Sequence, residues 1–66
     1  MTYSQAVAKA TRLAKQNRKS YFVVNEREDG MDHIDVCTEY DLDTFYAGIN
    51  ERDILWDTSQ LAHSAW

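Results

Sequence analysis

Apolar and polar positions alternate most clearly in the middle of the chain, between residues 20 and 40. Residues 21–24 form an aromatic and β-branched run, Tyr-Phe-Val-Val, which favours a pleated, half-buried surface. Farther along, Ile34, Val36 and Thr38 alternate with polar residues and Cys37, with the period of a strand that has one solvated face. Between these runs, Asp29-Gly30 is a strong turn signal, because both central residues of a tight hairpin turn need a positive φ. The pattern predicts a β-hairpin over residues 20–40.

The register of this hairpin decides which residues face the core, because a slip of one residue turns a whole strand face over. A two-residue loop at Asp29-Gly30 places Val23 opposite Val36. A three-residue loop that ends at Met31 pairs Val24 with Val36 instead. We favour the three-residue loop. It gathers one apolar face from Phe22, Val24, Ile34 and Val36 and leaves Asn25, Asp35 and Cys37 on the other face.

An amphipathic helix is predicted over residues 3–17. Thr2 and Gln5 match a capping box, in which each side chain binds the backbone amide of the other residue. Apolar residues then recur at helical spacing and form one face. These residues are Tyr3, Ala6, Val7, Ala10, Leu13 and Ala14.

Two further elements are predicted after the hairpin. A short helix or capped turn spans residues 41–48, with Asp41 as N-cap, Gly48 after its end, and Leu42, Phe45 and Tyr46 against the core. The apolar run at residues 54–56 is an edge strand or part of a second helix, and we favour the strand because Gly and Asn precede it. Trp56 is expected in the core. The tail 58–66 forms a last turn or is loose, with Trp66 exposed or in an interface.

These elements make an α+β fold with an N-terminal amphipathic helix packed on a two- or three-stranded antiparallel sheet. The 66 residues form one small domain, 1–66, and a domain of this size is only marginally stable. Cys37 is the single cysteine, so no internal disulfide forms, which fits a reducing compartment. No apolar run suits a membrane span and no signal-peptide pattern begins the chain, so we expect a cytoplasmic protein.

Charge is distributed very unevenly along the chain. Residues 1–19 hold five Lys or Arg and no acid, a formal +5, whereas residues 20–66 hold all eleven acids and two arginines, a formal −9. One interpretation is that the two parts attract each other in the monomer or form solvated faces. The other is that one pole is a docking surface, because summed charge steers association.

The acidic run is dense enough to suggest a protein-binding surface. Charges on short exposed strands also protect sheet edges against pairing with another chain, so edge protection is an alternative. The aromatic residues of the second half would mark a contact surface if several of them were exposed together. The candidate protein-binding residues are Glu26, Glu28, Asp29, Asp32, Asp35, Glu39, Asp41, Asp43, Tyr46 and Trp66.

The basic helix face supplies a second candidate surface, for nucleic acid, made of Lys9, Arg12, Lys15 and Lys19. Nucleic-acid-binding domains usually have a basic pI, whereas the pI of this chain is about 4.8. No zinc-finger, helix-turn-helix or glycine-loop motif accompanies the basic face. Nucleic acid is therefore the minority expectation.

His33, Asp35 and Cys37 could in principle form an activated thiol or part of a metal site, because they alternate on one strand face. Residues two apart on a strand are about 6.5–7 Å apart at the backbone, which is too far for a nucleophile–base hydrogen bond. Residues 28–32 do not match a calcium loop either. We expect no catalytic, metal or cofactor site.

The sequence therefore predicts a non-enzymatic acidic interaction module that binds another protein, in particular a basic or nucleic-acid-binding one. Size and acidity suggest a small bacterial or phage accessory or inhibitor protein. The alternatives are a nucleic-acid-associated regulator that uses the basic helix face, and a homodimer in which opposite poles pair.

Overall fold

The computed structural model describes residues 1–58 and confirms the α+β arrangement. The elements in chain order are α1 (Tyr3–Asn17), β1 (Tyr21–Asn25), β2 (Ile34–Thr38), α2 (Glu39–Asp43), the 3-10 turn η1 (Glu51–Asp53) and β3 (Ile54–Asp57). The three strands form one antiparallel sheet in the order β2-β1-β3. The predicted third strand is thus confirmed, and it lies beside β1, which becomes the central strand.

The hairpin adopts the register of the two-residue loop, so our preference for the three-residue loop was wrong. Val23 pairs with Val36 and Asn25 with Ile34. Asp29 and Gly30 have φ values of 50° and 78°, which is the positive pair that a tight hairpin turn requires. Glu28 and Met31 close this turn with two reciprocal backbone hydrogen bonds of 3.1 and 2.8 Å.

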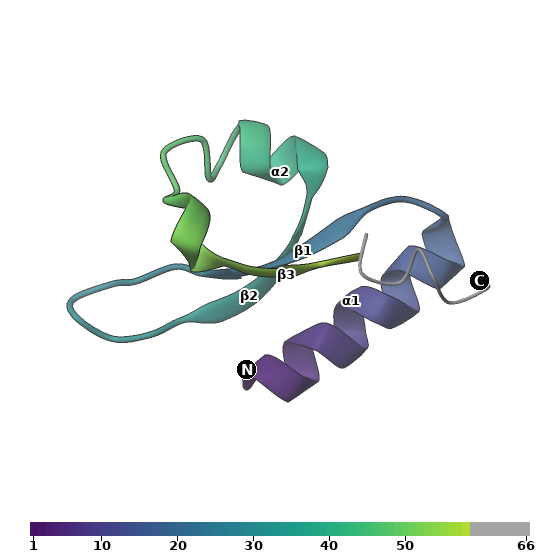
Figure 1. Cartoon of the computed structure of the whole chain (residues 1–66), viewed down its shortest axis with the longest axis horizontal. Coiled ribbons are helices and arrows are strands. Elements are labelled where there is room, and N and C mark those ends of the chain that lie inside the picture. The colour runs from purple at the N-terminus through teal and green to yellow at the C-terminus, as the bar shows by residue number, and fades with distance from the viewer. Residues whose placement is uncertain (59–66) are drawn as a thin grey trace.

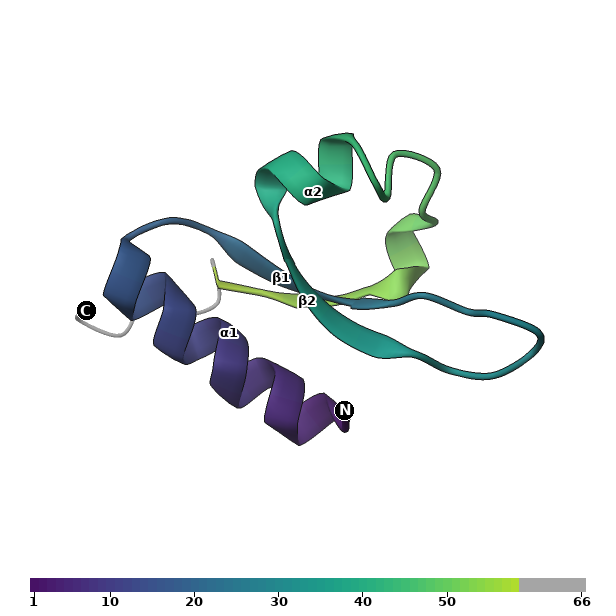
Figure 2. The ribbon, with the colours of Figure 1, turned by 180° about the vertical axis from the view of Figure 1, so that it is seen from behind.

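The sheet is covered on both faces, which explains why the preferred register failed. Figures 1 and 2 show α1 along one face and α2 with η1 along the other. Val23 packs in the core on the α1 side, and its neighbour Val24 points to the opposite face, yet both are 0% exposed. A continuous apolar run is typical of a strand that is buried on both faces.

Helix α1 has the predicted bounds and the predicted capping box. Gln5 N donates to Thr2 Oγ1 over 3.2 Å, and Thr2 N donates to Gln5 Oε1 over 3.0 Å. The helix approaches the sheet through Ala6, Ala10 and Ala14, which are all 0% exposed. Tyr3, which we expected on this face, is 47% exposed instead.

Helix α2 begins earlier and ends earlier than predicted. Its N-cap is Thr38, and Asp41 is the third helical residue of a second capping box, so the prediction of Asp41 as N-cap was wrong. Thr38 N donates to Asp41 Oδ2 over 3.0 Å, and Asp41 N donates to Thr38 Oγ1 over 3.2 Å. Because Thr38 also ends β2, the box joins strand and helix with no loop between them.

The chain returns to the sheet after α2 through β3. Leu42 and Tyr46 are half-buried as expected, whereas Phe45 is 82% exposed. Val23 pairs with Trp56 and Val24 with Ile54, so the register shifts between them. Trp56 is half-buried and packs against the core cluster. Within residues 1–58, no helix is long and apolar enough to cross a membrane.

Candidate functional site

The acidic candidates fall into two separate groups. One group, the acidic tip, is formed by Glu28, Asp29 and Asp32 on the part of the hairpin that projects beyond both helices (Figure 1). The other group lies on α2 and consists of Glu39, Asp41 and Asp43. Asp35 on β2 and Glu26 after β1 are half-buried between these groups. The sequence run is therefore not one continuous surface.

Two exposed aromatic residues accompany the acids of α2. Tyr40 is 71% exposed and Phe45 is 82% exposed, which is a high exposure for such large side chains. Tyr40 lies on α2 together with Glu39 and Asp43, which are also exposed, and Phe45 follows two residues after the end of this helix. We call Glu39, Tyr40, Asp43 and Phe45 the α2 surface. The candidate protein-binding residues predicted from the sequence include Glu39 and Asp43 but neither Tyr40 nor Phe45, and Phe45 was expected in the core.

A groove of about 390 Å³ lies next to this surface, between the end of β1 and the segment that connects α2 to η1. Its lining residues are Asn25, Glu26, Arg27, Phe45, Tyr46, Gly48, Ile49, Asn50 and Asp53. The Tyr46 hydroxyl donates to Glu26 Oε2 over 3.3 Å, which ties the connecting segment to the sheet. Burial, followed by the negative charge of Glu26, raises the pKa of Tyr46 to about 12, so its phenol stays protonated and remains a donor.

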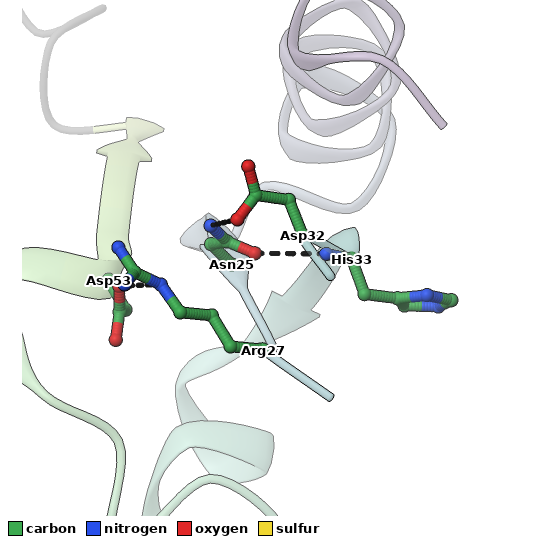
Figure 3. Close-up of polar contacts among 5 residues, drawn as sticks. All are labelled: Asn25, Arg27, Asp32, His33 and Asp53. Atoms are coloured by element: carbon green, nitrogen blue, oxygen red, sulfur yellow. Dashed lines mark hydrogen bonds and ion pairs between the residues drawn. The ribbon is translucent and has the colours of Figure 1, made fainter. Parts of the chain in front are cut away.

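One ion pair joins two of the residues that line the groove. Arg27 Nε lies 3.3 Å from Asp53 Oδ1, and Figure 3 shows the arginine reaching from the hairpin toward η1. Asp53 Oδ1 is buried and accepts no well-aligned hydrogen bond, so Arg27 is its charge partner within residues 1–58. Arg27 thus neutralises a carboxylate of the groove that would otherwise be buried without a partner.

The amide of Asn25 holds the hairpin extension in place. Asn25 Oδ1 accepts from His33 N over 3.0 Å and Nδ2 donates to Asp32 Oδ1 over 3.0 Å, as the dashed lines in Figure 3 show. The imidazole of His33 points away from these contacts. Asn25 is buried, so both polar ends of its side chain need these partners. This contact explains how a polar residue fits the face of β1 that packs toward α1.

We expect Asn25→Ala to lower the free energy of unfolding by about 1–3 kcal/mol, because it removes two hydrogen bonds and leaves the His33 amide without its acceptor. Asp32→Ala removes only the bond to Asn25 Nδ2, from an exposed residue, and should cost about 0.5–1 kcal/mol. Urea unfolding followed by circular dichroism measures both. Equal losses for the two variants would contradict a clamp centred on Asn25.

The basic residues lie along α1 and just after it, and the C-terminal end of this helix is at the opposite end of the molecule from the acidic tip (Figure 1). Arg12, Lys15 and Lys19 are exposed, and Lys9 is half-buried. Lys15, Lys19 and the neighbouring Arg18 line a common depression at the C-terminal end of α1. Lys19 Nζ also lies 6.0 Å from the centre of the Tyr21 ring, at the outer limit of a cation–π contact. Among residues 1–58, no ion pair joins these cations to the acidic part of the chain.

The three residues considered for thiol or metal chemistry are in different environments. His33 is exposed and precedes β2, Asp35 is half-buried, and Cys37 is buried at 3% exposure. Burial raises the pKa of Cys37 to about 11, with further contributions from the charges of Asp41 and Asp35. In the part of the chain that the structure describes, no three His, Cys, Asp or Glu residues gather as metal ligands would.

Comparisons with known proteins add no assignment to this geometry. Neither the family models, nor the curated proteins, nor the solved structures that were compared match this chain. Trp66, the last of the candidate protein-binding residues, lies outside the described residues. The α2 surface and the basic end of α1 therefore remain as the two candidate contact surfaces.

Proposed function

We propose that this chain is a non-enzymatic protein-interaction module that binds a basic partner protein through the α2 surface. The observation that carries the proposal is the exposure of Tyr40 and Phe45, at 71% and 82%, close in sequence to the exposed acids Glu39 and Asp43. Large aromatic side chains are enriched in protein–protein interfaces, and they become energetically important when a partner covers them.

The charges around these aromatic residues favour a partner that presents arginine. Glu39 and Asp43 make no ion pair within residues 1–58, so their carboxylates are available to an incoming cation. A guanidinium group stacks on the face of an aromatic ring and also pairs with a carboxylate through two parallel hydrogen bonds. Arginine can therefore stack on the aromatic rings and pair with the carboxylates of the α2 surface, whereas the compact ammonium group of lysine makes only the ion pair well.

The fold holds this surface in a defined position. The capping box of Thr38 and Asp41 fixes the start of α2 at the end of β2, and the bond from Tyr46 to Glu26 fixes the segment after Phe45. Such preorganisation supports binding because fewer side chains and loops need to be ordered on association.

We expect the double variant Tyr40→Ala/Phe45→Ala to weaken partner binding by about 30-fold or more, because central aromatic contacts contribute about 2 kcal/mol or more. Partners are captured from host lysate on the tagged wild-type chain and identified. The purified partner is then titrated calorimetrically against wild type and variants.

Tyr3→Ala is the matched control, because Tyr3 is a half-exposed aromatic residue on α1, on the other side of the sheet. It should bind like wild type. A partner whose affinity is unchanged in the double variant, or reduced equally by Tyr3→Ala, would contradict the proposed surface.

Nucleic-acid association is the second candidate, because Lys15, Arg18 and Lys19 line one depression and make no ion pair within residues 1–58. It predicts binding that weakens steeply with salt, with log K falling by about 0.9 in log salt for each phosphate contacted. Titration of labelled single- and double-stranded DNA at several salt concentrations, with Lys15→Ala/Lys19→Ala as the variant, separates this candidate from the first.

A further inference from the structure

Strand β2 lies at the edge of the sheet, and its outer side pairs with no strand among residues 1–58. The direction of its backbone groups follows from the ladder with β1. Glu26 N donates to His33 O over 2.8 Å, and Glu28 and Met31 exchange two hydrogen bonds, so these are hydrogen-bonded pairs. Hydrogen-bonded and non-hydrogen-bonded pairs alternate along an antiparallel ladder.

This alternation makes the pair of Val23 and Val36 a non-hydrogen-bonded one. The backbone N–H and C=O groups of Val36 therefore point away from β1, as do those of Ile34 and Thr38. Such a row of outward groups is a template on which another strand can pair.

Two of the three outward N–H groups already donate hydrogen bonds to carboxylates of the same chain. Val36 N donates to Asp35 Oδ1 over 2.8 Å, and Thr38 N donates to Asp41 Oδ2 over 3.0 Å. Hydrogen bonds to an ionised acceptor are stronger than those between neutral groups. An incoming strand would have to replace both of them to reach the backbone of β2.

The edge is also self-complementary. A two-fold axis through Val36 would place Val36 opposite Val36 of a second copy, and Ile34 opposite Thr38 of that copy. Two sheets would then join into one continuous antiparallel sheet with a closed, isologous interface. Ile34 and Val36 are only half-buried in the monomer, so their side chains would become more buried on such pairing.

We propose that β2 carries a latent self-pairing edge for a second copy of this chain, and that the Asp35 and Asp41 carboxylates keep this edge closed by binding the Val36 and Thr38 amides. Asp35 is at the centre of the proposed pairing, because its Oδ1 accepts the hydrogen bond of the Val36 amide, and the two-fold axis would pass through Val36. The inference is independent of the α2 surface and of its partner.

The test compares the solution mass of wild type and of Asp35→Ala over a range of concentrations, by sedimentation equilibrium. Wild type should remain at the 7.7 kDa of one chain. Asp35→Ala should dimerise with a Kd at least about tenfold lower than that of wild type, because a competing hydrogen bond to a charged group is lost from both copies. Hydrogen exchange should then show stronger protection of the Val36 amide as the dimer forms.

Asp43→Ala is the matched control, because it removes the same charge from an exposed position and Asp43 covers no outward amide of β2. It should stay monomeric. If Asp35→Ala loses the fold, Asp35→Thr replaces it, because threonine favours strands and has no carboxylate. A folded Asp35 variant that stays monomeric would overturn the proposal, as would equal dimerisation of Asp43→Ala or a wild type that already pairs through β2.

Discussion

Ala10→Leu is expected to lower the free energy of unfolding by about 2 kcal/mol or more, because overpacking a close-packed core typically costs about 1–3 kcal/mol. Ala10 is 0% exposed and belongs to the core cluster with Val23 and Tyr21. A leucine at this position would have to push α1 away from the sheet or adopt a strained rotamer. A small domain of this size usually has only about 3–5 kcal/mol of stability, so the loss is a large part of the total.

The measurement is thermal unfolding followed by circular dichroism. A loss of about 2 kcal/mol corresponds to a fall in Tm of about 8–16 °C for a domain of 60–100 residues. Ala8→Leu is the control, because Ala8 lies on the same helix and is exposed. An exposed leucine at position 8 should change the stability by no more than about 0.5 kcal/mol. Equal melting temperatures for the two variants would show that α1 does not depend on its small residues for packing.

The sequence was sufficient to predict α1, because local signals determine both its start and its buried face. The capping box of Thr2 and Gln5 is contained within four residues, and the alanines recur at helical spacing. Tyr3 shares that spacing but is 47% exposed. Helical periodicity identifies a face, but it does not show how far along the helix the sheet extends.

The register of the hairpin could not be predicted from alternation, because alternation distinguishes registers only when one face is wet. In this sheet Val23 and Val24 are both 0% exposed. The unbroken run at residues 21–24 was the available signal of two buried faces. The turn geometry of Asp29-Gly30 was the better guide, because two adjacent residues with positive φ suit a two-residue loop.

The residues of the candidate site were predicted only in part, because some of their orientations depend on contacts between residues far apart in the sequence. The acids of α2 were identified, but local patterns did not show that Phe45 points to solvent while Tyr46 turns inward to Glu26 over a separation of 20 residues. The second capping box was visible in principle, since Thr38 precedes Asp41 by three residues. Treating residues 34–39 only as a strand concealed it.

Cys37 in the folded protein is expected to react with a disulfide reagent at least about 100-fold more slowly than in the unfolded chain. Burial, together with the charges of Asp41 and Asp35, raises the pKa of the Cys37 thiol from 9.0 to about 11. Because only the thiolate reacts, a pKa higher by two units lowers the reactive fraction about 100-fold near pH 8. Steric exclusion adds to this effect, since the side chain is only 3% exposed.

The rate of reaction with Ellman's reagent, in buffer and in concentrated urea, measures this protection. The unfolded chain serves as its own control, because it contains the same single cysteine. A native rate within about tenfold of the unfolded rate would show that Cys37 is accessible and ionisable. That result would also reopen a nucleophilic role, because a nucleophilic cysteine needs a lowered pKa and access to its substrate.

The raised pKa of Cys37 also makes the free energy of unfolding fall as the pH becomes alkaline. The direction follows because the folded state holds the thiol proton more tightly than the unfolded chain does. The neutral thiol is favoured in the folded state, so its contribution is complete below pH 9 and is lost as the pH rises from 9 toward 11. A shift of this size corresponds to a loss of up to about 2–3 kcal/mol once the pH exceeds 11. Tyr46 ionises over a still higher range and remains in a Cys37→Ala variant, so the difference between wild type and that variant isolates the thiol. Urea unfolding at about pH 7 and pH 10 measures the effect. The free energy of unfolding of wild type should fall between these pH values by more than that of Cys37→Ala. Equal losses in the two proteins would assign the alkaline transition to another group.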